Sequence, residues 1–238
     1  MKAIVLCGGL GTRLGPLTAD LPKPLVDVAG RPFIAYVLDR LVAGGVDGFV
    51  LAAGFRAQKI RDAIGEEWRG ANVEYSIEAG PLGTGGAIAQ AFARSGLSEA
   101  IVVNGDTLLD FDARLLDQFA RERNADIGIA LKPVPDAGRF GRVLTDGDGR
   151  VTRFEEKGAS TAGLINAGFY HVQSRALARA ASPAFSFEYD LLKAHSADMA
   201  IFGLPTDGYF IDMGIPEDLA KARADLSRSS IYRQHERS

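Results

Sequence analysis

The stretch AIVLCGGLGTRL, residues 3–14, decides the fold class of this chain. It opens with a short apolar run, Ala3 to Leu6, which is typical of a buried parallel strand. The run stops abruptly at Gly8 and Gly9. Because glycine adopts backbone angles closed to other residues and lets amide groups approach phosphate oxygens, we expect a phosphate-binding loop directly after the strand.

Strand-like and helix-like patterns alternate after this loop up to about residue 110. Strands are predicted over residues 48–53, 73–77 and 100–103 and helices over residues 34–42, 57–64 and 86–94. Alternation of this kind is typical of βαβ units. The first half of the chain is therefore predicted to be Rossmann-like.

The second half changes character. Strands are predicted over residues 127–132, 141–145, 151–155, 167–172 and 200–204, and a closing helix over residues 216–226. The tight turn at residues 146–149, DGDG, indicates an antiparallel excursion. We predict an α/β fold with a Rossmann-like, mixed, mostly parallel central sheet flanked by helices. One domain is expected over residues 1–226, with halves of about 1–110 and 111–226, followed by a polar tail at 227–238.

The composition excludes several classes of function. The chain has 238 residues, 47% hydrophobic and 24% charged, which is typical of a globular protein with a filled core. A formal charge of −3 does not favour nucleic acid as a partner. A lone cysteine, Cys7, excludes an internal disulfide and a cysteine-cluster metal site. With no export or membrane segment in the sequence, we expect a cytoplasmic protein without a membrane partner, and both monomer and homo-oligomer stay open.

The glycine-rich loop matches neither common phosphate-binding pattern. No Lys-Ser/Thr pair follows it, as a P-loop requires, and Leu14 stands where the dinucleotide fingerprint has its third glycine. A plain turn between strand and helix is the alternative. Ten residues past Arg13, the stretch LPKPL at 21–25 holds Lys23 between two prolines that restrict the backbone.

Together, GGLGTRL at 8–14, PLT at 16–18 and KPL at 23–25 resemble the signature of the sugar-1-phosphate nucleotidyltransferases. The resemblance extends from Lys2 to about Leu226. It implies an enzyme that transfers a nucleoside monophosphate from an NTP to a sugar 1-phosphate, with Mg²⁺ as cofactor. It also implies catalytic roles for Arg13, Lys23 and Asp106, because cations positioned around a triphosphate neutralise the charge that gathers during transfer.

The stretch EAGPLGTGG at 78–86 resembles the base-recognition loop of the family. Its PLGT form is similar to that of guanylyltransferases and differs from the GLAQ form of thymidylyl enzymes. Glu78 is the candidate acceptor for the guanine N1 and N2 edge; a solvated loop acid is the alternative. The nucleotide-binding set implied by the resemblance is Leu6, Gly8, Gly9, Gly11, Thr12, Arg13, Lys23, Glu78, Pro81, Gly83, Thr84, Asn104 and Gly105.

Two aspartates are the candidate metal ligands. Asp106 follows a buried strand, at the end where open α/β sheets bind ligands. By resemblance, Asp212 in FIDMGIP at 210–216 matches a second metal aspartate that the family places in Asp-x-Gly-Thr-Pro; here Ile215 replaces the threonine. Mg²⁺ prefers hard oxygen ligands such as carboxylates. A helix cap or a turn is the alternative role for each aspartate.

Three stretches look like the sugar-phosphate pocket of the family: FGRV at 140–143, EEK at 155–157 and NAGFY at 166–170. We expect the antiparallel excursion to cover this pocket. The implied sugar-phosphate set is Gly141, Glu156, Lys157, Asn166 and Gly168. Glu156 would accept sugar hydroxyls and Lys157 would pair with the phosphate; for EEK alone, a solvated charged turn is the alternative.

The favoured substrates are GTP and D-glycero-D-manno-heptose 1-phosphate, because the short single-domain form is similar to that of the heptose guanylyltransferases. Their product would supply surface polysaccharide synthesis, such as capsule or lipopolysaccharide. Mannose-1-phosphate guanylyltransferase and a uridylyltransferase acting on MurNAc or hexose 1-phosphate are alternatives. A noncatalytic nucleotide-sugar sensor is an alternative of another class, disfavoured by the retained Arg13, Lys23, Asp106 and Asp212.

Overall fold

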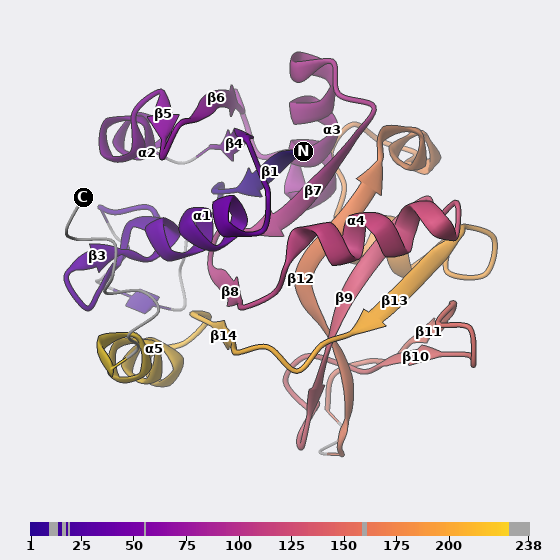
Figure 1. Cartoon of the computed structure of the whole chain (residues 1–238). Helices are drawn as coiled ribbons and strands as arrows, with labels where there is room; N and C mark the ends of the chain where they lie inside the picture. Colours follow the sequence, from indigo (N-terminus) through magenta and orange to yellow (C-terminus); the bar gives the residue numbers. More distant parts are fainter. Residues whose placement is uncertain (10–13, 16–17, 19, 55, 159–160, 229–238) are drawn as a thin grey trace.

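The computed structural model describes residues 1–9, 14–15, 18, 20–54, 56–158 and 161–228 (Figure 1). One eight-stranded sheet runs through the molecule in the order β13-β9-β12-β7-β1-β4-β6-β5. Its strands are β1 (Lys2–Leu6), β4 (Gly48–Ala53), β5 (Glu67–Trp68), β6 (Ala71–Ile77), β7 (Glu99–Asn104), β9 (Ile127–Val134), β12 (Gly163–Gln173) and β13 (Ile201–Pro205). Strands β7, β1, β4 and β6 pair in parallel, whereas β12 is antiparallel to both neighbours. The predicted α/β fold with a mixed, mostly parallel sheet is confirmed.

Helices cover both faces of this sheet (Figure 1). They are α1 (Phe33–Ala43), α2 (Ala57–Ile64), α3 (Gly83–Ser95), α4 (Ala113–Glu122) and α5 (Pro216–Arg228). Strand β1 shows why two cores form. Ala3 and Val5 pack into one hydrophobic cluster with α1 and α2, whereas Ile4 packs into the other with α3. Since successive strand residues point to opposite faces, a strand with apolar residues on both faces needs helices on both sides.

The predicted antiparallel excursion is a hairpin of β10 (Val143–Thr145) and β11 (Val151–Phe154). Strand β10 begins two residues later than predicted because Gly141 has a φ of +81°, which is not a strand conformation. Helix α4 was absent from the sequence prediction. Its start carried a signal, since Asp112 caps it by accepting a hydrogen bond from the Arg114 amide at 3.0 Å.

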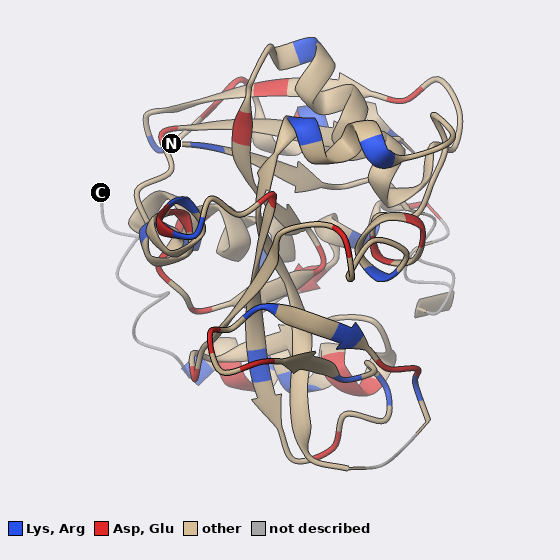
Figure 2. Cartoon of the chain, turned by 90° about the vertical axis from the view of Figure 1, so that its right-hand side faces the viewer, with Lys and Arg blue, Asp and Glu red and all other residues tan. Residues whose placement is uncertain are grey.

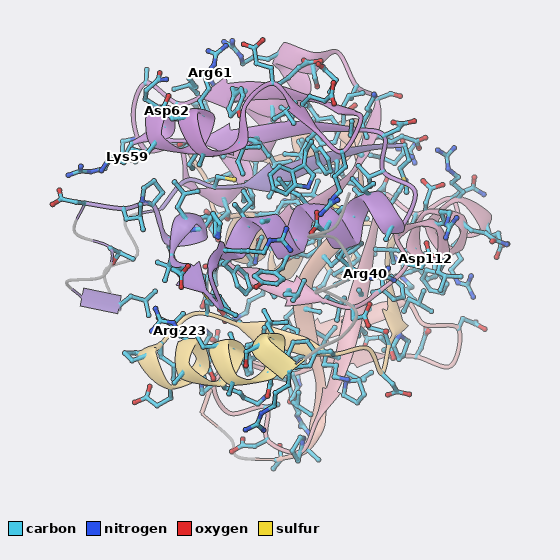
Figure 3. All side chains as sticks on the ribbon, turned by 60° about the vertical axis from the view of Figure 1, so that its left-hand side comes forward. Arg40, Lys59, Arg61, Asp62, Asp112 and Arg223 are labelled. Carbon is cyan, nitrogen blue, oxygen red and sulfur yellow. The ribbon has the colours of Figure 1, made fainter. Side chains whose placement is uncertain are left out.

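Short ladders join segments that are far apart in the sequence. Strand β14 (Phe210–Asp212) pairs antiparallel with β8 (Thr107–Leu109), and β2 (Asp27–Val28) pairs with β3 (Arg31–Pro32). Arg223 on α5 (Figure 3) donates to the Asp27 carbonyl oxygen at 3.1 Å. The C-terminal helix is thereby held against the N-terminal half.

Charged residues of both signs are interspersed along the chain (Figure 2). Many are paired, such as Arg40 with Asp110 at 2.7 Å and Arg139 with Asp218 at 2.7 Å. Among the described residues, no helix combines the length and the apolar character that a membrane span requires.

Candidate active site

The carboxyl ends of the neighbouring parallel strands β1 and β7 meet at one edge of the sheet. Gly105, just after β7, donates its amide to the Leu6 carbonyl oxygen at 2.9 Å. A Cβ at Gly105 would come within 2.7 Å of that oxygen, so only glycine permits this approach. The predicted loop residues Gly11, Thr12 and Arg13 lie outside the described residues.

A cavity of about 530 Å³ opens beside the glycines that follow β1. Seven residues of the predicted nucleotide-binding set line it: Leu6, Gly8, Gly9, Glu78, Pro81, Gly83 and Thr84. Its walls come from the end of β1 and from the loop that leads into α3. Residues of the two stretches that the sequence assigned to triphosphate and base binding therefore line one cavity.

Glu78 lies where the base-recognition loop leaves the sheet. Its Oε2 accepts a hydrogen bond from the Leu82 amide at 3.1 Å, which closes the loop on itself. Its Oε1 faces Gly8, where an added Cβ would lie 3.0 Å away. Glu78 is half-buried at the cavity wall, so it is not the fully solvated acid of the alternative interpretation.

The glycines at the start of α3 pack against the segment before the π-helix η4 (Phe187–Lys193). The amides of Gly85 and Gly86 both point at the Phe185 carbonyl oxygen, at 3.0 and 3.4 Å. A Cβ at Gly85 would lie 2.1 Å from the Phe185 ring. The start of α3, which borders the 530 Å³ cavity, is thereby connected to the second half of the chain.

Thr84 links the start of α3 to η4 through two hydrogen bonds. Its Oγ1 donates to Glu188 Oε2 at 2.8 Å and accepts from the Phe187 amide at 2.9 Å. The sequence predicted nucleotide binding for Thr84; in the structure its hydroxyl holds η4 on α3.

Replacing Thr84 with valine is expected to lower the free energy of unfolding by about 1–3 kcal/mol, because the buried Phe187 amide loses its acceptor. Urea denaturation of the two proteins measures the difference. Thr84→Ser keeps the hydroxyl and should stay close to the parent. A serine variant as unstable as the valine variant would show that the methyl group, not the hydroxyl, matters.

The charged centre of the site lies at the end of β7. Lys23 stands between Pro22 and Pro24 at the start of a 3-10 turn (Lys23–Leu25), and it is 8% exposed. Its Nζ lies 2.5 Å from Asp106 Oδ2. Asp212 is brought alongside because it pairs with Thr107 in the β14–β8 ladder, while the Met213 amide donates to the Asp106 carbonyl oxygen at 3.0 Å. Asp106 and Asp212 line one cavity.

This donor set fits Mg²⁺. The carboxylates of Asp106, in the turn before β8, and of Asp212, at the end of β14, line the same cavity and offer hard oxygen ligands, which this ion prefers. Burial and the charge of Asp106 hold the pKa of the nearby Cys7 thiol well above its usual value. Ile215 lacks the hydroxyl that the family pattern has before α5.

The cavity with both aspartates has a volume of about 320 Å³ and contains all five residues of the predicted sugar-phosphate set: Gly141, Glu156, Lys157, Asn166 and Gly168. Asn104, predicted for the nucleotide, also lines it. Asn166 donates to the Tyr170 hydroxyl at 2.8 Å and accepts from the Gly168 amide at 3.0 Å. Its orientation is thus fixed from two sides.

The predicted sugar-phosphate set leaves out two basic residues that line this cavity, although the FGRV stretch already contained one of them, Arg142. Lys193, at the end of η4, forms an ion pair with Glu156. Arg142 forms an ion pair with Glu155 at 2.6 Å. The motif FEYD at 187–190 was the available signal for η4, but its π-helical turn, which brings Lys193 to the cavity, was not predictable from spacing.

A family model described as Nucleotidyl transferase matches residues 2–229. The chain is 39% identical to a D-glycero-alpha-D-manno-heptose 1-phosphate guanylyltransferase of Aneurinibacillus thermoaerophilus, over 95% of this chain and 98% of that one. It is 37% identical to a mannose-1-phosphate guanylyltransferase of Mycobacterium tuberculosis, over 96% of this chain and 65% of that one.

Among solved structures, the crystal structure of HddC from Yersinia pseudotuberculosis complexed with GMP-PN superposes with a TM-score of 0.84 at 35% identity, covering 94% of this chain and 99% of that one. A Bacillus anthracis putative glucose-1-phosphate thymidylyltransferase shares the fold, with a TM-score of 0.85 at 20% identity and 96% coverage of each chain. With the geometry above, these similarities show that the chain belongs to the nucleotidyl transferase family, as a sugar-1-phosphate nucleotidyltransferase.

Proposed function

We propose that this enzyme transfers GMP from GTP to D-glycero-D-manno-heptose 1-phosphate, releasing pyrophosphate and forming a GDP-heptose. The observation that carries the proposal is the pair of cavities at one sheet edge, with the Lys23–Asp106 pair at the end of β7. The choice of substrates is supported by the heptose guanylyltransferase relative, which matches the chain at nearly full length on both sides. The product would supply surface polysaccharide synthesis.

The chemistry needs alignment and charge neutralisation. An oxygen of the sugar phosphate, already an anion, attacks the α-phosphorus and pyrophosphate leaves from the opposite side. Lys23 would offset charge on the phosphates, and the family signature implies the same role for Arg13. Asp106 and Asp212 would hold Mg²⁺, which when bound neutralises negative charge on phosphate oxygens. No covalent enzyme intermediate is required.

Recognition would divide between the two cavities. Glu78 at the wall of the larger cavity would accept the N–H groups at the guanine N1 and N2 edge. In the smaller cavity, Lys157 and Lys193 bring positive charge for the sugar phosphate, and Glu156 and Asn166 offer acceptors for sugar hydroxyls. Asn166 is half-buried and held by its hydrogen bonds to Tyr170 and Gly168, so a sugar that leaves it unpaired would bind less well; Glu156 is exposed and would contribute less to sugar selectivity.

A grid of nucleotides against sugar 1-phosphates tests the proposal by pyrophosphate release. ATP, GTP, CTP, UTP and dTTP would each be combined with the 1-phosphates of D-glycero-D-manno-heptose, mannose, glucose and MurNAc. The highest kcat/KM is expected for GTP with the heptose phosphate. A preference for mannose 1-phosphate or for UTP would replace this assignment with the corresponding alternative, and no turnover in any combination would favour a sensor.

A further inference from the structure

A second group of side chains that could bind a metal lies at the amino end of β7, whereas the active site lies at the carboxyl end of that strand. Glu99 begins β7, whereas Asn104 ends it in the smaller cavity. The five residue steps between them span about 17 Å of strand. His171 of β12 and Asp117 of α4 join Glu99, and one ligand atom of each lies within 4.8 Å of the others. Three different elements thus meet at this cluster.

His171 is the unusual member. Its side chain is 1% exposed, and neither ring nitrogen has a hydrogen-bond partner in the described part of the chain. Its Nε2 nevertheless faces Asp117 Oδ1 at 3.4 Å and Glu99 Oε2 at 3.6 Å. A buried polar group without a partner costs about 1–3 kcal/mol. A cation between the imidazole and the two carboxylates would be coordinated by all three groups.

The spacing of these atoms suits a small tetrahedral ion. Zinc bonds to nitrogen and oxygen are about 2.0–2.1 Å long, so two ligand atoms of one tetrahedral site lie about 3.4 Å apart. We propose that His171 Nε2, Glu99 and Asp117 form a Zn²⁺ site that ties β7, β12 and α4 together, with water as the fourth ligand. The site is distinct from the Asp106 and Asp212 pair and does not depend on the proposed substrates.

The protonation state of the histidine agrees with this role. Burial holds the pKa of His171 below its usual value, although the charges of Asp117 and Glu99 oppose the shift. The imidazole is therefore neutral near pH 7, which leaves one ring nitrogen able to donate a lone pair to a metal.

Arg121 neutralises the two carboxylates in this structure. It forms ion pairs with Asp117 Oδ2 at 3.0 Å and with Glu99 Oε1, so the oxygens that face the imidazole are the other ones, Oδ1 and Oε2. Gln173 also donates to Glu99 Oε2, at 2.5 Å. Because the Arg121 side chain is 56% exposed, it has room to move into solvent, and its positive charge opposes a dication nearby. Arg121 would therefore compete with a metal ion for the carboxylates of Asp117 and Glu99.

Isothermal titration of Zn²⁺ into the tag-free full chain tests the site. The parent protein would carry Asp106→Asn and Asp212→Asn, which removes the acids of the active site as binding groups. We expect one zinc ion per chain, bound at least about tenfold more tightly after Arg121→Ala. Arg114→Ala is the matched control, because Arg114 lies on the same helix and pairs with Asp112 outside the cluster.

Two ligand variants decide the outcome. His171→Gln should abolish the zinc binding, and His195→Gln, the matched histidine control, should leave it unchanged. Glu99→Gln alters a partly exposed ligand that a folded chain tolerates, and it should weaken binding by about 10- to 100-fold. Equal zinc affinity in the parent and in Glu99→Gln, or no zinc uptake by either the parent or Arg121→Ala, would overturn the proposal.

Discussion

Replacing Asp106 with asparagine is expected to lower kcat for nucleotidyl transfer by about 100- to 1,000-fold. Asp106 faces the cavity that also contains Asp212, and its Oδ2 lies 2.5 Å from Lys23 Nζ. The substitution removes the negative charge needed to hold a dication and to pair with the lysine. Asparagine keeps an oxygen acceptor at nearly the same place, so Lys23 retains a hydrogen-bond partner and the chain should stay folded.

Pyrophosphate release at saturating substrates and magnesium measures this loss, and thermal unfolding checks that the protein is intact. Asp148→Asn, in the exposed hairpin turn away from both cavities, is the charge-matched control and should keep full activity. Asp212→Asn should resemble Asp106→Asn, and the double variant should lose little more, because groups that act as a unit are not additive. Independent, multiplying losses would contradict a shared ion.

Much of the fold could be predicted because apolar runs with clear ends define its inner strands and helices. Strand β4 (Gly48–Ala53) and helix α2 (Ala57–Ile64) have the predicted bounds. Strand β4 is buried along its whole length, so its sequence shows one continuous apolar run. Short ladders give no such pattern: β8 and β14 have three residues each, and neither was predicted.

The candidate site could be predicted only where a motif marks it. No sequence periodicity relates Asp106 to Asp212. They line one cavity because β14 pairs antiparallel with β8. Only the family resemblance indicated that the two residues belong together. The part of Thr84 in holding η4 depends on a contact with Glu188, far along the chain, that local sequence cannot show. Lys193 lies at the end of the π-helix η4 and lines the smaller cavity, and residue spacing gives no signal for a π-helix.

Gly141→Ala is expected to raise KM for the sugar 1-phosphate by about tenfold and to lower the free energy of unfolding by about 2 kcal/mol. Gly141 lines the smaller cavity with a φ of +81°, a conformation that costs a non-glycine residue energy. Its new Cβ would lie 2.5 Å from the Glu155 carbonyl oxygen. Since that atom belongs to the backbone, the segment carrying Glu156 and Lys157 must move.

The change should be selective for the sugar, because the cavity at Glu78 and Gly8 has no lining residue in common with the one at Gly141. KM for GTP should therefore stay near that of the parent in steady-state assays with each substrate varied in turn. Gly147→Ala is the matched control: it lies in the turn of the β10–β11 hairpin, where an added Cβ meets no atom within 4 Å and the backbone has no positive φ. Equal effects of the two substitutions would show that hairpin stability, and not the position of residues 155–157, governs sugar binding.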